Sequence, residues 1–296
     1  MENQNQTPHK RRVRYKGKYP KKFEEKYKEL QPEKYKDTIE HVIQKGNTPA
    51  GMHISIMVKE IIDFLNIQPG EIGFDATLGY GGHTKAMLKC LNGKGHIYAT
   101  DVDPEESDKT KKRLADQGFG EDLLTVKLQN FCTIDEIAKE VGGFDFILAD
   151  LGVSSMQIDN PKRGFSFKVD GPLDLRLNQD AGISAAERLD TITRDELAGM
   201  LYENSDEPYC EELAKAITDE IRKGNRIDTT TKLRQVIEKT LDFLPEKEKK
   251  DTIKKTCQRT FQALRIDVNR EFEVLYEFME KLPDALRPGG RVAILT

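Results

Sequence analysis

The sequence predicts an α/β protein with a Rossmann-like parallel sheet and a helical insertion. First, short apolar runs alternate with segments of helical periodicity, which is the pattern of repeated βαβ units. Second, the glycine turn Gly79–Gly82 follows one such run and opens a helical segment, as in nucleotide-cofactor sites. Third, the alternation stops within residues 158–259, where several helical patterns follow one another. These residues are therefore predicted to form the insertion.

The elements of the first half each have their own signal. Apolar residues at helical spacing between Met52 and Leu65 predict a helix that packs on the sheet. The apolar run Ile67–Phe74 predicts the first strand, and a helical pattern from Thr84 to Leu91 follows its glycine turn. Three further apolar runs predict strands at His96–Thr100, Leu123–Gln129 and Phe144–Ala149.

The second half begins with irregular sequence. Residues 151–157 are mostly small, and Arg163–Arg176 is rich in Gly, Pro and charge, as in long loops that are either functional or disordered. Amphipathic helical patterns follow, and then a helix over Phe272–Leu286, a turn at Arg287–Gly290 and a last strand at Arg291–Thr296. The predicted domains are an arm at residues 1–50, a sheet domain at 51–157 and 260–296, and a helical insertion at 158–259.

Composition limits the class of protein. The chain has 296 residues, of which 37% are hydrophobic and 33% charged, and it contains no apolar run of 18 residues or more. Its N-terminus is polar and basic, unlike a signal segment, so we expect a cytoplasmic protein without a membrane span. The four cysteines lie far apart without metal-site spacing, which predicts reduced thiols and no metal site: Cys90, Cys132, Cys210 and Cys257.

Charge is concentrated at the N-terminus. Residues 1–36 carry twelve Lys or Arg against five Glu, a net +7, which leaves −11 for the rest of a chain whose total is −4. Aromatic residues alternate with cations between His9 and Lys22, as in arms that bind a polyanion such as RNA. A solvated tail explains the same composition, and both interpretations remain open at this point.

The glycine turn indicates the kind of ligand. The dinucleotide motif needs G-x-G-x-x-G, whereas this turn has G-x-G-G-H and follows the acidic residue Asp75. This pattern favours a ligand with an amino acid end, such as S-adenosylmethionine, over NAD. Asp101 ends the next predicted strand, about twenty residues beyond the glycines, where such folds place a carboxylate on the ribose hydroxyls.

Polar or aromatic residues follow the other strands too. Parallel strands present their carboxyl ends at one edge, so Asp75, Asp101, Phe131 and Asp150 are expected near one another. Phe131 is a candidate for contact with an adenine, or equally a residue at the rim of the core. Asp150 is the candidate catalytic residue, which either accepts a hydrogen bond from a reacting amine or holds the cofactor.

Five motifs occur in order along the chain: Asp75-x-Thr-x-Gly-x-Gly-Gly-His83, Asp150-Leu-Gly-Val-Ser-Ser155, Arg163-Gly-Phe-Ser-Phe167, Asp170-Gly-Pro-Leu-Asp-x-Arg176 and Arg259-Thr-Phe-Gln-Ala-Leu-Arg-Ile266. Together they resemble the bacterial 16S ribosomal RNA cytosine-N4 methyltransferases, the RsmH or MraW family, over residues 53–296. The resemblance implies a class I S-adenosylmethionine-dependent methyltransferase sheet with a helical insertion. The implied reaction is methyl transfer to the N4 amine of a cytidine in the small-subunit rRNA.

The same resemblance implies a set of site residues. The implied cofactor positions are Gly81, Gly82, His83, Asp101, Phe131, Asp150 and Gln157. The implied partner is 16S rRNA or the small ribosomal subunit, with no DNA and no membrane. We expect RNA contacts in the insertion, in the loop Arg163–Arg176 and near Arg259–Arg265, although salt-bridged packing explains any single arginine equally well.

Some positions differ from the family pattern. Ala76 stands where the family usually has Gly, Met156 where it usually has Pro, and the basic arm is longer than usual. The chain also stops at Thr296, where the family continues into a Phe-His-Ser segment, so we expect a truncated chain. Two alternatives remain from the sequence: an RNA-binding protein of the same fold without activity, and a Rossmann oxidoreductase, which the glycine spacing disfavours.

Overall fold

The computed structural model places the described residues in one compact unit, Ile54–Thr296. It describes residues 55–296, so the predicted arm at 1–50 and the predicted start of a helix at Met52 lie outside the described residues. Within the described residues, no helix is long and apolar enough to cross a membrane.

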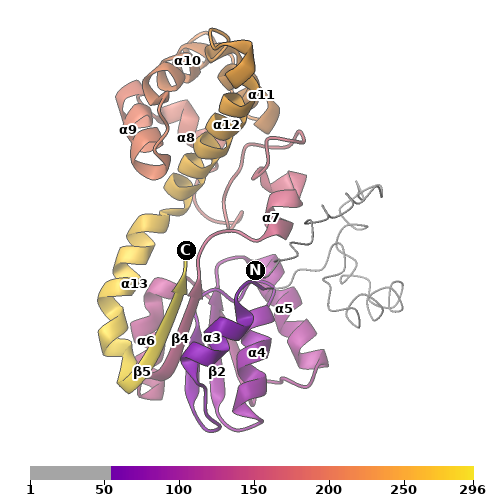
Figure 1. Cartoon of the computed structure of the whole chain (residues 1–296), viewed down its shortest axis with the longest axis vertical. Helices are drawn as coiled ribbons and strands as arrows, with labels where there is room; N and C mark the ends of the chain where they lie inside the picture. The colour runs from indigo at the N-terminus through magenta and orange to yellow at the C-terminus, as the bar shows by residue number, and fades with distance from the viewer. Residues whose placement is uncertain (1–54) are drawn as a thin grey trace, which may run out of the picture. The chain divides into compact units, whose positions relative to one another are not determined.

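A five-stranded parallel sheet forms the centre of the sheet domain (Figure 1), and its strand order is β3-β2-β1-β4-β5. The strands are β1 (Ile72–Asp75), β2 (His96–Asp101), β3 (Leu124–Leu128), β4 (Phe144–Asp150) and β5 (Leu286–Leu295). The chain runs outward from β1 to β3 and then crosses to β4 on the other side of β1. This reversal creates a switch point between β1 and β4, where ligands bind in open α/β sheets.

Helices cover both faces of the sheet, as Figure 1 shows. One face carries α3 (Val58–Leu65), α4 (Gly82–Leu91) and α5 (Pro104–Asp116), which contribute buried Leu65, Met87 and Leu114. The other carries α6 (Ile134–Val141) and α13 (Glu271–Ala285), which bury Ile137 and Phe278. Because both faces are covered, the strands between them have the continuous apolar sequence typical of parallel sheets.

Three details of the sheet domain differ from the sequence-based prediction. The first strand begins at Ile72 rather than Ile67, because the chain turns at Gly70, whose φ is +99°. Helix α13 buries Phe278 and Leu282, whereas Phe272 and Met279, which lie at helical spacing in the apolar pattern that predicted this helix, are exposed. The predicted turn at residues 287–290 lies within β5 as an irregularity, since Phe144 pairs with Leu286 but Phe146 pairs with Arg291.

Between β4 and α13 the chain forms a helical bundle with its own core. A short helix α7 (Ser155–Asp159) and the 3₁₀ turn η3 (Pro161–Arg163) come first. The bundle helices are α8 (Ala185–Thr191), α9 (Arg194–Ser205), α10 (Cys210–Arg222), α11 (Thr230–Thr240) and α12 (Glu246–Asn269). The sequence-based prediction did not identify α8. The predicted end of the insertion at residue 259 falls inside α12. Phe261 and Leu264, beyond that boundary, belong to the bundle core.

Candidate functional site

Three carboxylates lie at one edge of the sheet. Asp75, Asp101 and Asp150 are the last residues of β1, β2 and β4. In the strand register Asp75 pairs with Ala99 on one side and Leu148 on the other, so all three strands end within two residues of the same level. The structure therefore brings the predicted carboxylates together at the switch point.

Two glycines of the turn have no free space for a side chain. Gly81 is the N-cap of α4 and has a φ of 73°, a left-handed conformation that favours glycine. A Cβ on Gly81 would lie 2.7 Å from Cγ2 of Thr110, and one on Gly82 would lie 2.1 Å from Oγ of Ser55. The turn lies at the N-terminus of a ten-residue helix, where N–H groups and the helix dipole favour an anionic group.

Asp75 is almost fully buried below this turn. Its carboxylate accepts hydrogen bonds from the hydroxyl of Thr84 at 2.6 Å and from the backbone N–H of Thr77 at 3.1 Å. Burial raises the pKa of Asp75, and these two hydrogen bonds oppose the rise without cancelling it. Asp75 thus joins β1 to α4, and its role at the site is to hold the turn.

Asp101 fastens the other side of the turn. One carboxylate oxygen accepts the N–H of Gly79 at 2.8 Å, and the other accepts the N–H of Asp103 at 2.9 Å. Burial raises the pKa of Asp101, and the hydrogen bonds from Asp103 and Gly79 oppose this effect. Each oxygen keeps a further lone pair, so the carboxylate can accept ribose hydroxyls while it holds the loop.

His83 and Asp150 face each other across the same edge. Nε2 of His83 lies 2.8 Å from the carbonyl oxygen of Ile56, and because a carbonyl only accepts, Nε2 carries a hydrogen. Its Nδ1 lies 3.6 Å from Oδ2 of Asp150. The Asp150 side chain keeps 34% of its surface exposed, whereas His83 is buried, so Asp150 is the group that an incoming substrate can reach.

Phe131 and Gln157 flank this edge from two other segments. Phe131 begins the 3₁₀ turn η2 (Phe131–Thr133) after β3, and its ring meets that of Phe278 edge-on at 5.1 Å. Gln157 caps its own short helix through Ser154 and donates from Nε2 to Asp103 at 3.3 Å. Gln157 therefore contacts the loop that follows Asp101. Phe131 is half-buried and packs against Phe278.

The arginines singled out from the sequence are mostly paired with acids. Arg163 is buried and forms an ion pair with Asp103 at 2.7 Å, and Arg176 pairs with Asp174 through two nitrogens at 2.9 Å. Arg265 pairs with Glu271. For these three the packing interpretation accounts for the charge.

Sequence reasoning missed the partnership between Arg163 and Asp103. Half of the signal is visible in the sequence, because Asp103 precedes Pro104 and two glutamates, a typical helix N-cap. The other half depends on the fold, because Arg163 lies sixty residues away in a different segment.

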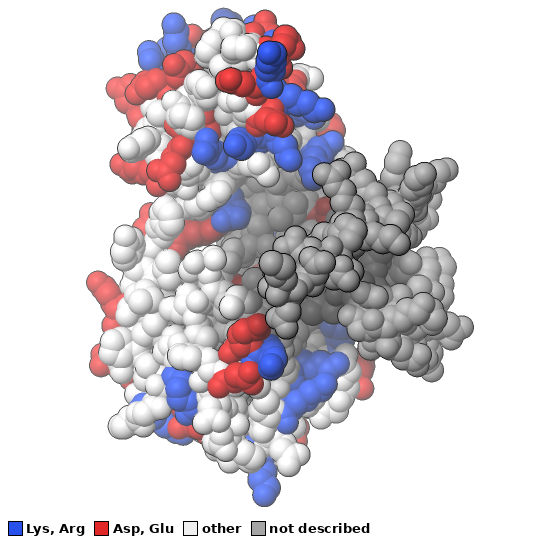
Figure 2. Space-filling model, in the orientation of Figure 1, with Lys and Arg blue, Asp and Glu red and all other residues white. Residues whose placement is uncertain are grey.

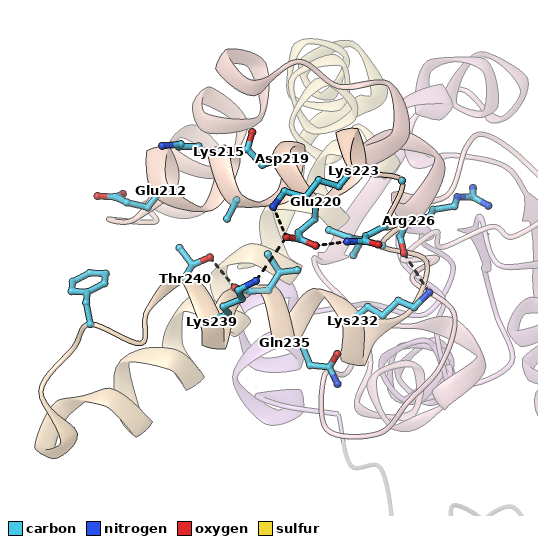
Figure 3. Close-up of a pocket in the computed structure, with 16 residues that line it drawn as sticks. Glu212, Lys215, Asp219, Glu220, Lys223, Arg226, Lys232, Gln235, Lys239 and Thr240 are labelled. Atoms are coloured by element: carbon cyan, nitrogen blue, oxygen red, sulfur yellow. Dashed lines mark hydrogen bonds and ion pairs between the residues drawn. The ribbon is translucent and has the colours of Figure 1, made fainter.

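A separate open groove lies within the helical bundle, between α10 and α11 (Figure 3), with a volume of about 1010 Å³. Charged side chains of both signs line it, and Glu220 contacts both Lys223 and Lys239. No residue of the predicted cofactor site contributes to the groove.

The parallel sheet, the glycine turn and the carboxylates at the switch point define an α/β methyltransferase. The MraW methylase family model matches residues 50–296, and the chain belongs to that family. A "Ribosomal RNA small subunit methyltransferase H 1" from Agathobacter rectalis is 87% identical over 288 residues, covering 97% of this chain and 82% of the relative. Another so named, from Lachnoclostridium phytofermentans, is 70% identical, covering 99% and 80%. A "Ribosomal RNA small subunit methyltransferase H" from Fusobacterium nucleatum is 40% identical, covering 82% and 75%.

Family membership confirms S-adenosylmethionine as the cofactor, and the residues present fit it. Gly81, in its left-handed conformation, brings the backbone of the turn to the N-terminus of α4, and this helix end suits the carboxylate of a methionine end. The carboxylate of Asp101 suits vicinal hydroxyls. These features favour an S-adenosylmethionine site over a dinucleotide site, because the turn lacks the third glycine of the dinucleotide motif.

Proposed function

We propose that this chain transfers a methyl group from S-adenosylmethionine to the N4 amine of a cytidine in 16S rRNA. The curated relatives named as small-subunit rRNA methyltransferases support the RNA substrate, and the five motifs support the base and the atom. The observation that carries the proposal is the meeting of Asp75, Asp101 and Asp150 with the glycine turn at one edge of the sheet.

We assign the cofactor site to a set of residues around this turn. The set comprises Gly81, Gly82, His83, Asp101, Phe131, Asp150 and Gln157. The turn and His83 lie nearest the N-terminus of α4, Asp101 offers lone pairs for the ribose, and Phe131 offers a ring beside β3. When bound, the cofactor supplies the activated methyl group.

The chain contributes position and one acceptor. The exocyclic amine of cytosine is a weak nucleophile because its lone pair is conjugated with the ring. A carboxylate that accepts a hydrogen bond from this amine draws the lone pair out of conjugation, and it then takes the proton that the methylated amine releases. Asp150 is suited to this role because it ends β4 at the switch point and its side chain is accessible. Alignment of the two reactants contributes roughly 7–11 kcal/mol of the barrier reduction.

The test is methyl transfer to an unmodified 16S rRNA transcript, with the product nucleoside identified by mass spectrometry. We expect N4-methylcytidine, and we expect Asp150→Ala to lower kcat by about 100-fold or more, with a smaller change in cofactor affinity. Asp108→Ala, which removes an exposed carboxylate from α5, is the matched control and should leave kcat unchanged. RNA binding without methylation would instead favour the inactive RNA-binding alternative.

A further inference from the structure

The buried Arg163 connects two segments that serve different parts of the proposed reaction. Only 5% of this residue is exposed. Its NH1 group contacts Oδ2 of Asp103 at 2.7 Å, and its NH2 group donates to the carbonyl oxygen of Leu177 at 2.6 Å. Asp103 belongs to the loop after β2, whereas Leu177 lies in the loop that leads into the helical bundle.

On the cofactor side, the contacts continue to the glycine turn. The N–H of Asp103 donates to the carboxylate of Asp101, whose other oxygen holds the N–H of Gly79. Asp103 also accepts the side-chain amide of Gln157 at 3.3 Å. A ligand that binds the carboxylate of Asp101 therefore acts on a group one hydrogen bond away from the partner of Arg163.

On the bundle side, the contacts continue to the end of α12. The carbonyl of Arg163 accepts the N–H of Leu175, a buried residue with a φ of 65°. Asn269, the last residue of α12, donates to the carbonyl of Leu175 at 2.8 Å and accepts the N–H of Leu177 at 2.7 Å. A non-glycine residue in this conformation persists only where neighbouring contacts impose it, and such residues cluster at functional sites.

Stability alone does not explain this arrangement. Buried ion pairs add little net stability because desolvation offsets their attraction. In addition, the buried Nε of Arg163 has no hydrogen-bond partner among the described residues, which is unfavourable. A guanidinium in this place has a geometric use, because its planar fork spans two segments at fixed angles.

We propose that Arg163 is a positioning residue that couples cofactor binding to the loop at residues 164–177, so that the cofactor-bound protein holds RNA more tightly. This inference rests on the proposed function. Coupling between two sites is reciprocal, so RNA must tighten cofactor binding by the same factor. The expected factor is roughly tenfold, within the usual range of about 5–150.

The first experiment measures RNA affinity with and without saturating S-adenosylhomocysteine, which cannot react, using an unmodified 16S rRNA transcript. In the unaltered chain, S-adenosylhomocysteine should tighten RNA binding roughly tenfold. Arg163→Met, which keeps length but loses the fork, should reduce this ratio to about one. Arg163→Lys keeps the charge beside Asp103 but cannot span both partners, so it should restore the ratio only in part.

Arg287 provides a matched control. It contacts Asp145 at 2.7 Å and the carbonyl oxygens of Gly142 and Val141 at 3.0 Å, the same kinds of partner at the opposite end of β4. Arg287→Met should lower stability while it leaves the affinity ratio unchanged. A ratio that falls equally in both variants, or persists in a folded Arg163→Met, would overturn the proposal.

A second experiment needs no RNA. Amide hydrogen exchange of residues 164–177 should slow when S-adenosylhomocysteine alone is added to the unaltered chain, and it should not respond in Arg163→Met. Unresponsive exchange in the unaltered chain, together with normal methylation of RNA, would reject the coupling and leave the proposed function standing. Exchange that slows with S-adenosylhomocysteine, in a chain that methylates no RNA, would reject the proposed function and leave the coupling through Arg163 standing.

Discussion

At the scale of single residues, the site depends on backbone positions that cannot accept a side chain. Two carboxylates hold the turn and the start of α4. Gly79 donates its N–H to Asp101, and Thr84 donates its hydroxyl to Asp75. Asp75 and Asp101 therefore already accept hydrogen bonds from the protein when no ligand is bound. Their hydrogen bonds fix the loop in advance, and this reduces the ordering cost of cofactor binding.

Gly81→Ala tests this view against a control of equal backbone geometry. Gly81 and Gly93 both have a φ of 73°, but only a Cβ on Gly81 would meet neighbours, whereas nothing lies within 4 Å of one on Gly93. Both variants should lose roughly 1 kcal/mol of unfolding free energy through backbone strain, and Gly81→Ala should lose more because its Cβ also meets Thr110. Calorimetry with S-adenosylmethionine should show at least a tenfold loss of affinity for Gly81→Ala alone. Equal affinity in the two variants would show that the turn does not contact the cofactor.

At the scale of elements, helices hold the site through contacts on their own sides of the sheet. Helix α13 returns from the bundle and packs on α6, and Lys281 on α13 donates to the carbonyl oxygen of Cys132 at 2.7 Å. Cys132 follows Phe131 in η2, so this contact links α13 to the turn that carries the proposed adenine neighbour. The position of that ring thus depends on how α6 and α13 pack.

The carboxylate of Asp135 gives this packing a pH dependence. Hydrogen bonds from Lys139 and Lys281 hold the pKa of Asp135 down to about 2, from an ordinary 3.8. Because the folded pKa is lowered, the stabilisation is complete above pH 4 and disappears as the pH falls towards 2. The contribution is below about 1 kcal/mol, since the pair is near the surface.

Urea unfolding at a series of pH values checks this. Between pH 5 and pH 2 the unaltered chain should lose more unfolding free energy than Asp135→Asn, which has no carboxylate to protonate. If the two curves stay parallel over this range, Asp135 does not contribute through its charge.

At the scale of the whole described unit, two hydrophobic cores of the sheet domain and one of the bundle account for its organisation. Figure 2 shows cationic and anionic side chains intermixed on the face of the bundle that is in view. In the groove between α10 and α11, Lys215 has no ion-pair partner within residues 55–296, whereas Lys223 pairs with Glu220. Among the groove cations, Lys215 is therefore one whose charge no acid within residues 55–296 neutralises.

Lys215→Glu tests whether the bundle contacts RNA. If Lys215 neutralises one phosphate, this variant should weaken RNA binding and reduce the slope of log affinity against log salt by about one. Lys89→Glu, the same charge change on α4 of the sheet domain, is the control. A similar loss in both variants would point to overall charge rather than to a contact made by the groove, and cofactor affinity should be unaffected in each.

The sequence by itself determined the strands of the sheet in their order along the chain and the carboxylates at the strand ends. Apolar periodicity and glycine spacing are local properties, so they predicted β2, β3 and β4 to within a residue or two and placed Asp101 and Asp150 correctly at strand ends. Local signals were weaker where several conformations suit the same residues. The first strand was therefore predicted too long, and α8 was not predicted.

Only the tertiary structure decided which charges face each other. The sequence allowed Arg163 to contact RNA or to pack, and the fold placed it against Asp103, sixty residues away, in a buried pair. The approach of the His83 ring to Asp150 and the continuation of α12 past residue 259 into the bundle core have the same origin. Such partnerships arise when separate segments are brought together and desolvated, and no periodicity within a single segment records them.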